Sequence, residues 1–103
     1  MKERISIEMD DLGSFLLIKV AGELSERTSM HFKKTAFSEI KEHGHSHMVI
    51  DFSKTEYVDS SGIGLLSALA SRLNGLSGRL GIINPSDAIR DVLNISLEGA
   101  AIN

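Results

Sequence analysis

With 103 residues, of which 42% are hydrophobic and 24% charged, the chain predicts one globular domain (1–103) with a single core, not a disordered or fibrous protein. It contains no cysteine, which excludes disulfides, thiolate zinc sites and cysteine nucleophiles. A net charge of −3 without a basic stripe argues against nucleic acid, and no apolar run reaches the roughly 18 residues of a membrane span, so we expect a cytoplasmic protein that binds neither.

The first elements of the chain predict a β-hairpin. Ile5 and Ile7 alternate with polar residues, which is the pattern of a half-buried strand. A turn is expected over residues 10–13, because this segment contains two aspartates and a glycine. The apolar run 15–20 then predicts a second, more deeply buried strand, which pairs antiparallel with the first and ends at Gly22.

A helix is expected after the hairpin. Ser25 is the predicted N-cap residue. The helix is expected to continue to about His43 and to stop at Gly44. Lys33 falls inside the apolar stripe, so we expect its aliphatic stem to be buried and its ammonium to reach water. The inward face is expected to contain Ser29, Phe32, Ala36, Phe37 and Ile40, with Met30 at its edge.

Further strands and helices alternate after this point. The apolar run 48–52 predicts a central strand, and an amphipathic pattern from Ser60 to about Leu73 predicts a helix. A loop over 74–78 leads to a strand over 80–83.

The last part of the chain predicts a third helix and a short edge strand. Asn84 and Pro85 are expected as N-cap and first helical residue, and residues 100–103 as the strand. The residues expected to face inward on this helix are Ala88, Ile89, Val92 and Leu93. The whole order, β-β-α-β-α-β-α-(β), predicts an α/β fold with a mixed sheet of four to five strands and helices packed on it.

A polar cluster stands where the central strand leads into the second helix, the usual place for a functional loop in an open α/β sheet. Asp59, Ser60 and Ser61 can each accept hydrogen bonds from the unpaired N–H groups of a helix start. Gly62 and Gly64 have no side chains, so another molecule could approach the backbone closely there. We therefore expect the function of the chain at this junction.

Neither a serine hydrolase site nor a phosphate-binding loop is favoured for this cluster. The Gly-x-Ser-x-Gly motif of a serine hydrolase is absent, because Val58 and Asp59 stand two positions before Ser60 and Ser61, and every histidine lies upstream. The glycine pair lacks the Gly-x-x-x-x-Gly-Lys and Gly-x-Gly-x-x-Gly patterns of phosphate-binding loops. We expect no enzymatic activity and no cofactor.

Three histidines alternate at His43, His45 and His47, which in an extended segment would bring their imidazoles together. Metal sites usually combine ligands from separate elements, supported by a second layer of contacts. We therefore favour an ordinary helix end and exposed turn over a metal site.

The helix over 60–75 has an unusually smooth outer face. Its inward face is expected to contain Gly62, Ile63, Leu66, Leu69, Ala70 and Leu73, with Leu65 at the border. The opposite face carries Ser61, Gly64, Ser67, Ala68, Ser71 and Gly75, where an ordinary surface helix would carry Glu and Lys. We favour a docking surface for a partner protein, and the alternative is that small residues are merely tolerated there.

The segment from Val58 to Leu65, Val-Asp-Ser-Ser-Gly-Ile-Gly-Leu, resembles the Asp-Ser-Ser/Thr-Gly-Leu-Gly signature of STAS-domain anti-sigma factor antagonists. Gly22-Glu23-Leu24 resembles the Gly-Glu-Leu-Asp segment of the same family. The order of elements matches this family over nearly the whole chain.

The resemblance implies a bacterial partner-switching protein that regulates transcription. It would bind an anti-sigma factor that is itself a Ser/Thr kinase, and so free a sigma factor. Phosphorylation by this kinase is implied at Ser60, and a Ser phosphatase would reverse it. The implied partner-binding residues are Glu23, Ser25, Asp59, Ser60, Ser61, Gly62, Gly64, Ser67, Ala68 and Ser71. The alternative is a STAS scaffold in a sensory or transport assembly without a phosphorylation cycle.

Two departures from the family pattern stand out. Ser25 occupies a position where many members have Asp, which removes a negative charge near the implied phosphosite. The chain also stops at Asn103, near the last expected strand, without the C-terminal helix of many members. An open sheet edge or helix layer would allow self-association as a weak homodimer.

Overall fold

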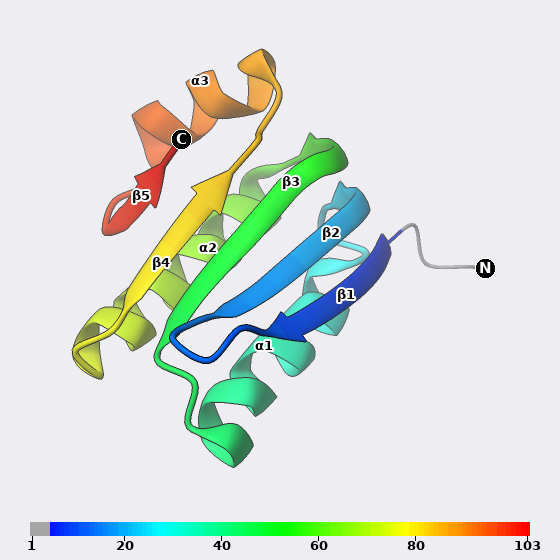
Figure 1. The fold of residues 1–103 in the computed structure, drawn as a ribbon. Helices are drawn as coiled ribbons and strands as arrows, with labels where there is room; N and C mark the ends of the chain where they lie inside the picture. Colours follow the sequence, from blue (N-terminus) through cyan, green and yellow to red (C-terminus); the bar gives the residue numbers. More distant parts are fainter. Residues whose placement is uncertain (1–4) are drawn as a thin grey trace.

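The computed structural model describes residues 5–103, which form an α/β layer of five strands and three helices (Figure 1). In chain order, the elements are β1 (Ile5–Asp11), β2 (Leu16–Leu24), α1 (Ser29–His43), β3 (His47–Val58), α2 (Ser60–Gly75), β4 (Arg79–Ile83), α3 (Asp87–Ser96) and β5 (Ala100–Ile102). The expected fold class, the hairpin and the final edge strand are confirmed.

The sheet has the strand order β1-β2-β3-β4-β5, antiparallel between β1 and β2 and parallel elsewhere. Helices α1 and α2 lie behind it in Figure 1, and α3 lies beside the β4–β5 edge. The core forms between the sheet and these helices, and its fully buried side chains include Phe32, Ile18, Ile50, Leu66 and Ile82. In the part of the chain that the structure describes, no helix is long and apolar enough to cross a membrane.

Strand β2 continues past Gly22, where we expected it to end. Gly22 has φ 105°, a conformation that suits glycine, and the register with β3 shifts on both sides of it. The strand then pairs Leu24 with Val58, so β3 also runs six residues beyond the expected end at residue 52. This extension brings the ends of β2 and β3 together beside α2.

A buried side chain compensates for the irregular pairing. Val20 falls at the register shift, and its carbonyl accepts a hydrogen bond of 2.7 Å from Thr55 Oγ1. Because Thr55 is buried, water cannot donate to the Val20 carbonyl there, and the Thr55 hydroxyl supplies the hydrogen bond.

Thr55→Val is expected to lower the free energy of unfolding by about 1–3 kcal/mol, because the Val20 carbonyl loses its side-chain donor while the shape is kept. Urea unfolding of the purified variant measures the loss. Thr35→Val is the matched control, since Thr35 Oγ1 also donates to a carbonyl, that of His31, but in a more exposed place. Equal losses in the two variants would contradict a special role for Thr55.

Helices α1 and α3 begin later than expected. The N-cap of α1 is Thr28, not Ser25, and that of α3 is Ser86, whose hydroxyl accepts from Ile89 N–H at 3.2 Å. Asn84 instead adopts φ 57° and donates to Asp51 Oδ1 at 3.3 Å. At the other end of α1, Gly44 is left-handed at φ 69° and stops the helix as expected.

The buried faces of these helices are narrower than expected. On α3, Ile89 and Leu93 are buried, whereas Ala88 and Val92 are exposed. On α1 the buried residues are Phe32, Ala36 and Ile40. Lys33 is exposed, in agreement with the expected access of its ammonium to water.

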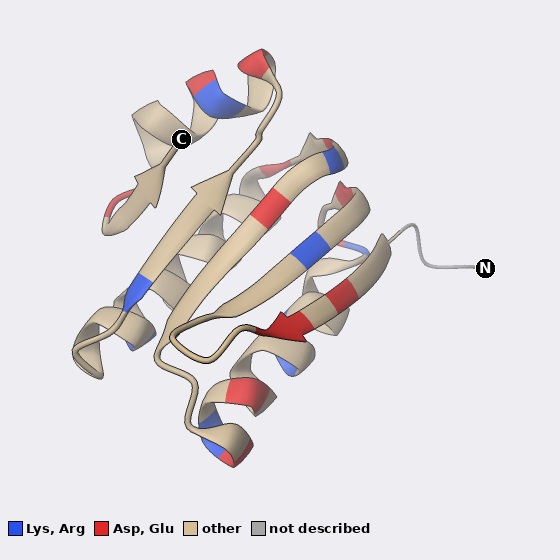
Figure 2. Ribbon diagram, viewed as in Figure 1, with Lys and Arg blue, Asp and Glu red and all other residues tan. Residues whose placement is uncertain are grey.

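The face of the sheet that α1 and α2 leave open carries a polar row. Glu8 pairs with Lys19, and Lys19 with Asp51, so charges alternate across β1, β2 and β3 (Figure 2). Burial raises the pKa of Asp51, but hydrogen bonds from Ser53 and Asn84 and the charge of Lys19 outweigh it and lower the pKa below its usual value. Asp51 is therefore held ionised as part of the sheet.

Candidate partner-binding and phosphorylation site

The polar cluster lies at the carboxyl end of the central strand, as expected. Strand β3 ends at Val58 and α2 begins at Ser60. Because β2 runs parallel to β3 and pairs Leu24 with Val58, the loop after β2 lies beside the start of α2. Segments about 35 residues apart thus form one surface.

Asp59 joins the two segments and caps the helix. Its Oδ1 accepts from Gly62 N–H at 3.1 Å, and its Oδ2 accepts from Glu26 N–H at 3.1 Å. Its own N–H donates to the Leu24 carbonyl at 3.1 Å. Of the three residues that could cap the helix, Asp59 is therefore the N-cap, and Ser60 is exposed as the first residue of α2.

Asp59→Ala is expected to lower the free energy of unfolding by about 1–2 kcal/mol, because the helix cap and the link to Glu26 are both lost. Asp59→Asn should lose less, since its amide oxygen can still accept from Gly62 N–H while its NH₂ group cannot accept from Glu26. Urea unfolding of both variants measures the order. An unchanged Asp59→Ala variant would contradict the capping role.

Thr28 holds the loop between β2 and α1 and was missed by the sequence analysis. It is 1% exposed, its Oγ1 donates to the Glu23 carbonyl at 2.7 Å, and it accepts from Ser25 N–H at 2.9 Å. The Ser25 carbonyl accepts from Ser29 N–H at 2.7 Å. Both Ser25 and Thr28 are good N-cap residues at neighbouring turns, so composition alone could not choose between them.

Ser25 and Gly62 do not fit the partner-contact role that we expected. Ser25 is 8% exposed and serves the turn described above. Gly62 is buried, and a Cβ placed there would lie 2.5 Å from the Leu24 carbonyl oxygen and 3.0 Å from Val58 Cγ1. Gly62 therefore allows α2 to pack against β2 and β3.

Gly64 differs from Gly62 although only one residue separates them. It is exposed, and a Cβ placed there would meet nothing within 4 Å. Among residues 5–103, no neighbouring atom therefore requires glycine at this helical position, where alanine would be more stable.

The faces of α2 follow the expected projection. Leu65, Leu66, Leu69, Ala70 and Leu73 are buried together with Gly62. The exposed or half-buried residues of the outer face are Ser61, Gly64, Ser67, Ala68, Ser71 and Gly75. Glu23 is half-buried near the end of β2, where it pairs with Tyr57 of β3.

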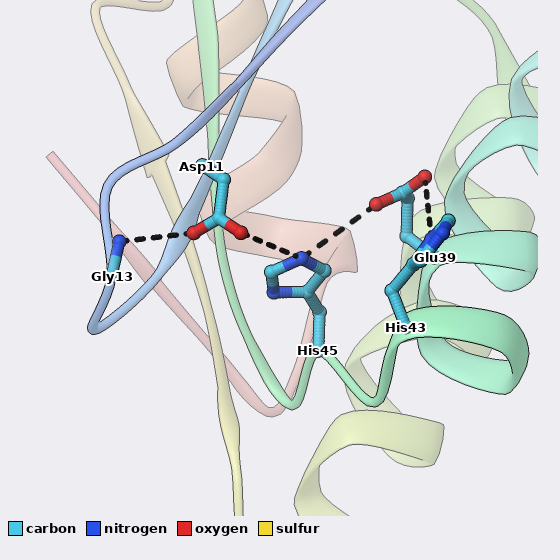
Figure 3. A network of polar contacts seen from close by, with 5 residues as sticks. All are labelled: Asp11, Gly13, Glu39, His43 and His45. Carbon is cyan, nitrogen blue, oxygen red and sulfur yellow. Dashed lines mark hydrogen bonds and ion pairs between the residues drawn. The ribbon is translucent and has the colours of Figure 1, made fainter.

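Two of the three alternating histidines contact carboxylates (Figure 3). His45 Nε2 lies 3.5 Å from Asp11 Oδ2 and 3.7 Å from Glu39 Oε1, and His43 Nδ1 lies 3.3 Å from Glu39 Oε2. His47 instead lies 3.3 Å from the hydroxyl of Ser46. Among residues 5–103, no group of three or more His, Cys, Asp or Glu side chains could hold a metal ion.

Comparisons with known proteins bear on the fold and the family of the chain. The family model described as STAS domain matches residues 6–97. The curated relative named Anti-sigma F factor antagonist, from Paenibacillus polymyxa, is 23% identical over 92 residues, which are 89% of this chain and 79% of that protein.

Two solved structures of SpoIIAA share the fold. The unphosphorylated form of this anti-sigma factor antagonist gives a TM-score of 0.79 at 21% identity, covering 95% of this chain and 87% of that one. The phosphorylated form, described as a Bacillus cell fate determinant, gives 0.78 at 22% identity, covering 95% and 89%. Since the family model spans most of the sequence, the chain belongs to the STAS domain family.

Proposed function

We propose that this chain is an anti-sigma factor antagonist controlled by phosphorylation of Ser60. The observation that carries the proposal is the exposed Ser60 at the first position of α2, beside a capped and smooth helical face. The unphosphorylated chain binds an anti-sigma factor kinase and so frees a sigma factor, and phosphorylation of Ser60 releases the kinase. The name of the curated relative and the two phosphorylation states of SpoIIAA support this proposal.

The chemistry of the switch follows from the position of Ser60. A phosphate adds about −1.5 to −2 charge units and three acceptor oxygens. At the N-terminus of α2 this charge is favourable, because the positive end of the helix dipole lies there. Against a partner surface that excludes water, the same group is an unpaired charge, so binding is lost while the domain stays folded.

The remaining site residues take separate roles in this proposal. Ser61, Gly64, Ser67, Ala68 and Ser71 form the contact surface on α2. Glu23 and Asp59 border it, and Asp59 also fixes the loop after β2 through Glu26 N–H. Ser25 and Gly62 support the surface from inside. The kinase supplies the catalytic groups and binds ATP, and a Ser phosphatase restores the binding form. The chain itself therefore acts as a regulatory substrate and not as an enzyme. Its proposed location is the cytoplasm.

Mapping the phosphate tests this proposal. The purified chain is incubated with ATP and the anti-sigma factor kinase encoded in the same genome, and the modified residue is identified by mass spectrometry. We expect a single phosphate on Ser60, no phosphate on the Ser60→Ala variant, and normal phosphorylation of the matched Ser61→Ala control. Phosphate on Ser61 alone, or no phosphate at all, would refute the assignment.

A STAS scaffold without a phosphorylation cycle is the second candidate. The smooth face of α2 favours it to the same degree, because docking on small residues requires no phosphate. It predicts a non-kinase partner and unchanged binding by Ser60→Asp, which a pull-down with the purified partner would show.

A further inference from the structure

A groove begins beside the proposed contact surface, between α1 and α2, and continues along one face of α1. Its first part is a hollow of about 310 Å³, lined by Ser61, Gly64 and Ala68 of α2 and by Met30 and Lys33 of α1. Met30 and Lys33 also line a second hollow of about 330 Å³ farther along α1, and all the residues that line this second hollow belong to α1. We call the two hollows together the α1–α2 groove.

One face of α1 forms the wall of this groove. It consists of Met30, Lys33, Lys34, Phe37, Ser38 and Lys41, which fall at the i, i+3, i+4, i+7, i+8 and i+11 spacing of a single helical face. Met30 is 60% exposed, and Phe37 is half-buried. This face therefore offers apolar side chains that are flanked by lysines.

The charge of the groove is mainly positive. All three lysines are exposed, and the carboxylate that borders the same hollow is that of Glu42 at the far end. The chain as a whole has a net charge of −3, so this concentration of lysine is not a general property of its surface. A partner segment that fits the groove must supply carboxylates.

We infer that the α1–α2 groove binds an acidic amphipathic helix of the anti-sigma factor kinase. This inference rests on the proposed function, whose contact surface shares Ser61, Gly64 and Ala68 with the groove. Small residues at helical spacing allow the backbone of a partner helix to approach closely, and its apolar face covers Met30 and Phe37. From Met30 to Lys41 the wall is about 17 Å long at about 1.5 Å per residue, which corresponds to three helical turns.

The same chemistry links the groove to the switch. Ser60 precedes Ser61, which lines the end of the groove at the start of α2. A phosphate on Ser60 brings negative charge next to the carboxylates of the bound helix. Repulsion between these groups adds to the desolvation cost of the phosphate and favours release.

Charge reversal in the groove tests this inference, with the purified kinase from the same genome as the probe. Lys33→Glu is expected to weaken binding of the kinase about tenfold or more, and most of this loss should depend on the salt concentration. The affinity of Lys33→Gln should lie between those of Lys33→Glu and the wild type. Arg79→Glu is the matched control, because Arg79 is also exposed but starts β4 at the opposite end of the sheet. It should change the affinity less than about twofold, a difference that calorimetry at two salt concentrations resolves.

The outcomes separate this inference from the proposed function. If Lys33→Glu binds like the wild type while Ser60→Asp still releases the kinase, the groove assignment is overturned and the proposed function stands. If the wild-type chain does not bind the kinase, the proposed function fails and the groove assignment fails with it. If amide NMR signals of Met30 and Ala68 shift with protein concentration alone, the occupant is a second copy of this chain, which also overturns the assignment.

Discussion

Replacing Ser60 with Asp is expected to weaken binding of the anti-sigma factor kinase at least about tenfold while changing the free energy of unfolding by less than about 1 kcal/mol. The loss of binding arises because the partner must cover an ionised carboxylate without a counter-charge. The folded domain tolerates the change, because Ser60 is exposed and Asp59 already supplies the helix cap. Calorimetric titration and urea unfolding of the same preparation measure the two quantities.

Two controls accompany the Ser60→Asp variant. Ser60→Asn tests size without charge and should bind close to the wild type. Ser60→Ala should also bind, but without release when ATP is added. A large loss of stability in Ser60→Asp would instead make Ser60 mainly a structural residue, and unchanged binding would remove the switch from this position.

The glycine pair of α2 is expected to respond in opposite directions when each glycine is replaced by alanine. Gly62→Ala should lower the free energy of unfolding by about 1–3 kcal/mol, because the added Cβ would lie 2.5 Å from the Leu24 carbonyl oxygen and force the helix away from β2. Gly64→Ala should raise it by about 0.5–1 kcal/mol, because the Cβ meets nothing within 4 Å and alanine favours the helix. Thermal and urea unfolding measure both changes.

Binding by Gly64→Ala then distinguishes a docking surface from a tolerated run of small residues. If a partner helix approaches α2 closely, the added methyl group should weaken binding of the kinase although the domain is more stable. Gly75→Ala is the matched control, because Gly75 is also exposed with nothing within 4 Å of an added Cβ but lies at the far end of α2. Equal or stronger binding by Gly64→Ala would support mere tolerance.

Local patterns predicted most of the fold but not its boundaries. The alternation from Ile5 and the run 80–83 identified strands because a half-buried or buried strand leaves a direct trace in the order of residues. The bulge at Gly22 was missed, since its left-handed φ depends on how β2 pairs with β3. The start of α1 was misplaced because the tertiary contacts of the loop after β2, such as the bond from Thr28 Oγ1 to the Glu23 carbonyl, leave no trace in the order of residues.

The features of the candidate site also divide into those that local sequence predicts and those that depend on tertiary contacts. The sequence alone determined the Asp59-Ser60-Ser61 cluster, its place after a central strand and the smooth outer face of α2, because each depends on residues adjacent in the chain or on one helical period. Only the tertiary structure decided that Asp59 binds Glu26 N–H, that Gly62 packs inside while Gly64 remains open, and that α1 supplies Met30 and Lys33 to a shared groove. These features join segments about 30 residues apart, and their contacts are fixed by the pairing of β2 with β3 and the packing of α1 beside α2, which no local pattern encodes.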